Sequence, residues 1–139
     1  MNAIIEKGAW EFIEFAVDSG ATETVITEDM LPCIELKDGW ASRNKVEYEV
    51  ANGERIPNMG EKCCSGSTEE GLNRCITAQV CDVKKALMSV KKIVSAGNRV
   101  VFEEEGSYIE DKRTREKIWL REEKGMYMLK LWVQNKGFF

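Results

Sequence analysis

The strongest constraint on the fold is a strand pattern near the start of the chain that ends in a polar loop. Residues 10–17, WEFIEFAV, alternate apolar and acidic residues and then become fully apolar, which is typical of a β-strand that enters a hydrophobic core. The sequence DSGA (residues 18–21) follows at once, and the β-branched run of residues 24–26 predicts a second short strand. The chain therefore places the Asp18 carboxylate at the inner end of an apolar strand.

Further strand and turn signals follow. Residues 46–50, VEYEV, alternate again and lead into Asn52-Gly53, the strongest short hairpin signal, so a return strand is expected near residues 56–62. Because Pro57 would be awkward in a central strand, we expect this hairpin to project from an edge of the sheet. Residues 74–80, RCITAQV, predict another strand.

The segment from Val83 to Val94 fits two descriptions. Its apolar residues recur at helical spacing, which predicts one helix of about four turns. A strand through Leu87, followed by a shorter helix from Ser89 to Ala96, fits the same residues. Both descriptions stay open at this point.

The end of the chain reads as β structure. Residues 99–102 predict a strand, and three more short strands follow, joined by turns at Glu105-Gly106, at residues 112–115 and at Lys124-Gly125. The sequence as a whole therefore predicts a mostly β protein with one helix.

Composition excludes several kinds of site. The chain of 139 residues contains no histidine, which removes Ser-His-Asp and Cys-His catalysis and His-ligated zinc, and leaves acid–base chemistry to carboxylates, lysine, tyrosine or thiols. No Cys-x-x-Cys pair occurs, so neither a zinc site nor a disulfide framework is predicted, and free thiols in a reducing compartment are expected. The five cysteines are Cys33, Cys63, Cys64, Cys75 and Cys81.

Charge and hydropathy argue against two kinds of partner. The net charge is −4 and no basic block occurs, so nucleic acid is not an expected partner, and the lysines at positions 84, 85, 91 and 92 are interpreted as a solvated face. No apolar run approaches the length that spans a membrane, and the first ten residues lack the features of a secretion signal, so no membrane association is expected.

The triplet Asp18-Ser19-Gly20 has two interpretations. It is a common turn signal, but its apolar flanks suggest a buried carboxylate, which is costly unless its charge is stabilised. A second identical carboxylate beside it could share one proton, as in aspartic proteases. Asp18 would then supply half of the pair, the Ser19 hydroxyl would brace two loops, the Gly20 N–H would approach the carboxylate, and Ala21 would keep the pocket floor small. Because only one such triplet occurs, a complete pair requires two chains about a two-fold axis.

Several ordered segments extend beyond this triplet: VDSGATETVI, YEVANGERIPNMGE, ALMSVKKIVSAGNRVVF, SYI and GMYMLKLWV. Together they resemble the retropepsin family of aspartic proteases, closest to the protease region of copia-type retrotransposon polyproteins. The resemblance implies a retropepsin-like acid protease fold: a small closed β-barrel with a hairpin that closes over substrate (the flap), one short helix, and a C-terminal β appendage. Ser89 stands where retropepsins usually have glycine.

The resemblance assigns roles to particular residues. Asp18, Ser19 and Gly20 form the catalytic loop, and the third segment supplies an inner strand, the short helix and a terminal strand for dimer contact. Ala21, together with residues 51–53 (Ala51, Asn52 and Gly53) of the flap, is expected to contact an extended peptide. No cofactor and no metal is implied. Residues 1–102 are expected to form the protease domain and residues 103–139 a short β-rich extension.

The resulting hypothesis is a homodimeric aspartic endopeptidase that cleaves a polyprotein, in the cytoplasm or within a retroelement particle. One alternative is a catalytically inactive, retroelement-derived module that dimerises or binds peptides. Another is an unrelated β-barrel binding domain in which Asp18-Ser19-Gly20 is only a turn. The sequence alone leaves all three open.

Overall fold

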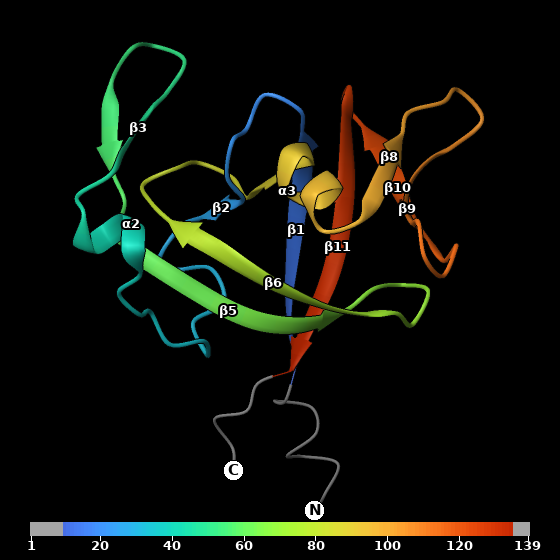
Figure 1. The fold of residues 1–139 in the computed structure, drawn as a ribbon, viewed down its shortest axis with the longest axis horizontal. Helices are drawn as coiled ribbons and strands as arrows, with labels where there is room; N and C mark the ends of the chain where they lie inside the picture. The colour runs from blue at the N-terminus through green and yellow to red at the C-terminus, as the bar shows by residue number, and fades with distance from the viewer. Residues whose placement is uncertain (1–9, 135–139) are drawn as a thin grey trace, which may run out of the picture.

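The computed structural model describes residues 10–134, and these residues form a mostly β protein, as the sequence predicts (Figure 1). In chain order the strands are β1 (Trp10–Asp18), β2 (Val25–Ile26), β3 (Glu47–Glu49), β4 (Arg55–Pro57), β5 (Gly60–Ser67), β6 (Asn73–Val80), β7 (Leu87–Ser89), β8 (Asn98–Val101), β9 (Ser107–Asp111), β10 (Lys117–Glu123) and β11 (Met126–Gln134). Two short helices, α2 (Trp40–Arg43) and α3 (Val90–Ser95), accompany them. No helix among the described residues is long and apolar enough to cross a membrane.

Nine strands form one sheet in the order β1-β7-β2-β6-β5-β11-β10-β9-β8. An additional pairing between β1 and β11 brings six of them into a partial ring, in which β2 and β7 meet at a single residue pair, Val25 with Leu87. The strands β10, β9 and β8 extend the sheet beyond this ring. The remaining two strands, β3 and β4, form a separate sheet.

One of the two longest pairings in the ring joins the two ends of the described chain. β1 and β11 run antiparallel over eight residue pairs, from Trp10 opposite Gln134 to Val17 opposite Tyr127. Alternate residues of both strands enter the core, because successive side chains of a strand point to opposite faces. The core-facing residues include Phe15 of β1 and Leu131 of β11, each 1% exposed.

The C-terminal strands belong to this same sheet and core. The turns after β8, β9 and β10 lie where the sequence predicts them, and Lys124 and Gly125 both have positive φ, as a tight two-residue hairpin turn requires. Ile109, Ile118 and Leu129 pack in one cluster with the core residues of β1. Residues on both sides of position 102 therefore share one core; residues 1–9 and 135–139 of the two predicted domains lie outside the described part.

The strand assigned by resemblance to dimer contact is paired within the chain. Residues 98–101 form β8, which runs antiparallel to β9 with Asn98 opposite Asp111. β8 stands at the end of the sheet order, and its other edge has no strand partner within residues 10–134.

The segment with two descriptions adopts the second of them. Leu87, Met88 and Ser89 form β7, which runs parallel to the end of β1, and α3 begins directly afterwards. Ser89 caps this helix, since its Oγ accepts a hydrogen bond from the Lys92 N–H at 3.2 Å. Pairing with β1 thus outweighs the helical spacing of the apolar residues. The expectation of a single helix is wrong, because the four-residue helix α2 also forms.

The predicted hairpin projects from the body of the molecule (Figure 1). β3 and β4 pair antiparallel, with Glu47 opposite Pro57 and Glu49 opposite Arg55. The return strand is shorter than expected: β4 ends at Pro57, and β5, which begins at Gly60, joins the large sheet instead.

Candidate functional site

β1 ends at Asp18, the first residue of a loop that we call the Asp18 loop (residues 18–24). The Gly20 N–H donates a hydrogen bond to Asp18 Oδ1 at 2.7 Å, the contact expected of this glycine. A Cβ at position 20 would lie 3.3 Å from the same oxygen, so a side chain there would crowd the carboxylate. Asp18 is partly exposed, and Ser19 and Gly20 are exposed, so this end of the loop is open to contact in the single chain.

Ser89 anchors the Asp18 loop through buried hydrogen bonds. Its hydroxyl is fully buried and donates to the Ala21 carbonyl at 2.7 Å, while its N–H donates to Thr24 Oγ1 at 3.1 Å. Ser89 also stands beside Asp18 in the parallel register of β1 and β7. Sequence analysis noted this serine only as a departure from the glycine of retropepsins. A serine directly before a helix is a common N-cap, and this signal could have identified Ser89 as a structural residue of the site.

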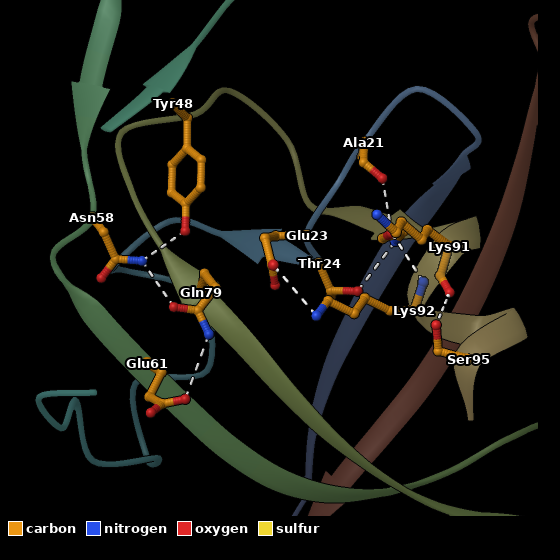
Figure 2. A network of polar contacts seen from close by, with 11 residues as sticks. Ala21, Glu23, Thr24, Tyr48, Asn58, Glu61, Gln79, Lys91, Lys92 and Ser95 are labelled. Atoms are coloured by element: carbon orange, nitrogen blue, oxygen red, sulfur yellow. Dashed lines mark hydrogen bonds and ion pairs between the residues drawn. The ribbon is translucent and has the colours of Figure 1, made fainter. Parts of the chain in front are cut away.

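The base of the hairpin is held by a buried amide that sequence analysis did not find. Asn58 Nδ2 donates to the Tyr48 hydroxyl at 2.9 Å and to Gln79 Oε1 on β6 at 2.8 Å (Figure 2). The backbone joins as well: the Asn58 N–H donates to the Val46 carbonyl, and the Gly60 N–H donates to Asn58 Oδ1, both at 2.8 Å. Burial raises the pKa of the Tyr48 phenol, which keeps it neutral as a hydrogen-bond partner.

The tip of the hairpin contains three of the four residues predicted to contact substrate, Ala51, Asn52 and Gly53, and all three are exposed. Gly53 has φ of +86°, and its N–H donates to the Val50 carbonyl at 2.9 Å, which closes the turn. The tip stands clear of the Asp18 loop in this conformation (Figure 1). The structure thus brings Asp18, Gly20 and Ala21 into one loop and leaves the hairpin tip apart from them.

A groove of about 470 Å³ lies between the Asp18 loop and the base of the hairpin. We call it the hairpin groove. Its lining combines two aromatic rings and three carboxylates with small and polar side chains: Thr22, Glu23, Trp40, Ala41, Val46, Glu47, Tyr48, Glu61 and Gln79. The groove reaches both the Asp18 loop and β3, so an extended segment lying in it would pass beside the loop that carries Asp18.

The five cysteines are free thiols, as expected. Burial, together with the Glu11 carboxylate whose Oε1 lies 2.7 Å from Cys33 Sγ, raises the pKa of Cys33 to about 12. Burial likewise raises the pKa of Cys81 to about 11. Both thiols therefore stay protonated at neutral pH, and neither is a suitable nucleophile.

No family model and no curated protein matches this sequence.

Proposed function

We propose that this chain is an aspartic endopeptidase of the retropepsin type that acts as a homodimer and cleaves peptide bonds in a polyprotein. The observation that carries the proposal is the geometry of Asp18. Its carboxylate ends a strand, accepts the Gly20 N–H at 2.7 Å and remains partly exposed. Because the chain holds a single Asp-Ser-Gly triplet, the second carboxylate comes from another copy.

Each Asp18 has a distinct role in the proposed reaction. One carboxylate accepts a proton from a bound water molecule, which attacks the peptide carbonyl, and the partner's Asp18 donates a proton to the carbonyl oxygen. The two carboxylates share one proton before the reaction, because like charges so close cannot both ionise without a large cost. The Gly20 N–H holds the carboxylate in place throughout, and no cofactor takes part.

The hairpin groove is the proposed path of the substrate. An extended peptide can add its backbone to a strand edge while its side chains occupy neighbouring pockets. The β3–β4 hairpin supplies such an edge, because it forms its own two-stranded sheet beside the groove. For the peptide to contact Ala51, Asn52 and Gly53, the hairpin must bend toward the Asp18 loop. Such a movement is possible because β3 and β4 form a separate sheet that joins the rest of the chain only at the base of the hairpin.

A second candidate, an inactive peptide-binding module, is favoured by one specific observation. The strand that the resemblance assigns to dimer contact, β8, already pairs with β9 in the same chain. A chain that binds peptide in the hairpin groove without a partner would lack the second carboxylate and would therefore not hydrolyse it.

A cleavage assay separates the two candidates. Folded protein at high concentration is incubated with a peptide library at several acidic and neutral pH values, and products are identified by mass spectrometry. We expect cleavage with a rate maximum on the acidic side of neutral, and its complete loss in Asp18→Asn. That variant keeps an Oδ1 for the Gly20 N–H but can neither accept the water's proton nor donate one in turn. Asp82→Asn, at an exposed position outside the groove, is the matched control and retains activity.

The two contrary outcomes are distinct. Cleavage that survives in Asp18→Asn would exclude the proposed chemistry. Peptide binding to the wild-type chain without any cleavage, at every pH and concentration tried, would favour the inactive module.

A further inference from the structure

A second cavity adjoins the hairpin groove, since Glu23 and Gln79 line both of them. It has a volume of about 370 Å³ and opens between β6, α3 and the C-terminal strands. We call it the C-terminal cavity. Its deep wall is aliphatic and comes from buried core residues, among them Met88, Ile109, Ile118, Leu129 and Leu131.

The size of this cavity is suited to a small ligand. Pockets that bind small molecules begin at about 300 Å³. The C-terminal cavity, at about 370 Å³ and open to solvent on one side, is therefore large enough for a small ligand.

Polar side chains that line the cavity already have partners. Thr24 Oγ1 accepts from the Ser89 N–H, Thr68 Oγ1 accepts from the Leu72 N–H, and Asn98 Nδ2 donates to a backbone carbonyl of α3. An occupant therefore needs no polar groups along its length, and the aliphatic wall favours an apolar chain.

The charged residues of the cavity stand at its mouth. They are Lys92, Arg74 and Glu23, a formal net charge of +1 in a chain whose net charge is −4. Lys92 Nζ lies 3.4 Å from Glu23 Oε2 (Figure 2), and the Arg74 side chain reaches Glu116 only at 3.8 Å. Lys92 is exposed and Arg74 is partly exposed, so neither ion pair is strongly held, and Lys92 can turn to an added anion. Arg74 Nη1 also donates to the Asn73 carbonyl at 2.7 Å, which leaves its other N–H groups to meet the anion.

We propose that the C-terminal cavity binds an aliphatic carboxylate, with the hydrocarbon chain against the wall formed by β9, β10 and β11 and the carboxylate beside Lys92 and Arg74. This site uses neither Asp18 nor the hairpin tip, although it shares Glu23 and Gln79 with the lining of the hairpin groove. A linear acid of medium length matches both the apolar interior and the cationic mouth.

The test uses decanoate and its neutral analogue decanol as probes of the full chain. Binding is measured by isothermal titration calorimetry and by methyl chemical shifts of the isoleucines and leucines. We expect one decanoate per chain, with shifts at Ile109, Ile118 and Leu131. Ala96→Phe, at an exposed position that lines the mouth, places a bulky ring where the ligand enters. It should lower the affinity for both probes by about tenfold or more, which is a loss of about 1.4 kcal/mol of binding free energy or more.

The charge requirement has its own matched pair. Lys92→Gln should lower the affinity for decanoate several-fold and leave that for decanol unchanged, because only the acid uses the ammonium group. Lys91→Gln, on the same helix but outside the lining, should change neither. Circular dichroism confirms that each variant is folded.

Three outcomes would overturn the proposal. The first is that neither probe binds to the folded chain. The second is that Ala96→Phe leaves the affinity unchanged, which would place the binding outside the C-terminal cavity. The third is that Lys92→Gln and Lys91→Gln change the affinity for decanoate equally.

Discussion

Ser89 joins three parts of the candidate site through one small side chain. Its Oγ donates to the Ala21 carbonyl and accepts the Lys92 N–H, and the residue is fully buried. Ser89→Ala removes both hydrogen bonds and leaves a buried carbonyl without its donor. We expect the free energy of unfolding to fall by about 2 kcal/mol, as measured by urea denaturation.

The matched control for this prediction is Ser95→Ala. The Ser95 hydroxyl lies on α3, the helix that Ser89 caps, and donates to the Lys91 carbonyl, but Ser95 is exposed. Its loss should change stability by less than about 0.5 kcal/mol. Equal effects of the two substitutions would show that the Ser89 hydroxyl contributes no more than an exposed hydroxyl of α3 and does not anchor the Asp18 loop.

Cys33 makes the stability of the fold sensitive to alkaline pH. Burial and Glu11 raise the pKa of Cys33 from 9.0 to about 12, so the folded state holds this proton more tightly than the unfolded chain. The stabilisation is complete below about pH 9 and is lost as the pH rises toward 12. Cys33→Ser keeps a donor for Glu11 without this titration, so the free energy of unfolding should fall less steeply over that range.

The comparison needs an exposed thiol as its reference, because lysines and tyrosines also titrate at high pH. Cys63→Ser, on the exposed side of β5, is that reference, and the slope of the free energy of unfolding against pH is compared between the two variants. A Cys33→Ser variant with the wild-type slope would contradict the assignment of the raised pKa to Cys33.

At the scale of elements, the hairpin tip offers a test of flap movement. Gly53 has φ of +86° and a Cβ there would meet nothing within 4 Å, so Gly53→Val strains the backbone without a clash. Because β3 and β4 form a separate sheet, the melting temperature should change little, whereas peptide turnover should fall strongly.

Gly71 provides the matched control for this substitution. It has φ of +85°, it also has open space around it, and it lies in the turn between β5 and β6 outside the hairpin groove. Gly71→Val carries the same backbone strain and should leave turnover unchanged. Equal loss of turnover in both variants would remove the flap role from the hairpin.

Elements with strong local signals were predictable from the sequence. The alternation in β1, the Asn52-Gly53 turn and the three C-terminal turns all lie where pattern and turn chemistry place them. β7 was not decided, since its three residues fit a helical period and only pairing with β1 selects the strand. Of the candidate site, the sequence indicated the Asp18 loop but not Asn58. The buried Asn58 amide donates hydrogen bonds to side chains ten and twenty-one residues away, and no local pattern predicts such contacts.

At the scale of the whole molecule, closure of the ring could not be read from local patterns. β11 pairs with β1 across more than a hundred residues of chain, and no periodicity specifies that partner. The resemblance to retropepsins implied an appendage after residue 102. In the structure the apolar faces of the C-terminal strands complete the core, since Leu129, Leu131 and Val133 pack with Ile13 and Phe15.

The proposed dimer predicts how activity depends on concentration. Each chain holds one Asp-Ser-Gly triplet, so a monomer has half of the proton-sharing pair and no activity. Specific activity should therefore fall on dilution, in step with the loss of dimer seen by analytical ultracentrifugation. A monomeric species that keeps full specific activity would contradict the dimer.

A tandem chain of two copies joined by a flexible linker isolates the cause of that loss. Linking makes the second association intramolecular, so the specific activity of the tandem should not fall on dilution. Asp18→Asn in only one of its two copies should abolish activity, because the remaining carboxylate has no partner with which to share a proton. If the half-substituted tandem kept about half of the activity, each copy would be working alone, and the pairing of two Asp18 carboxylates would be wrong even though cleavage itself is real.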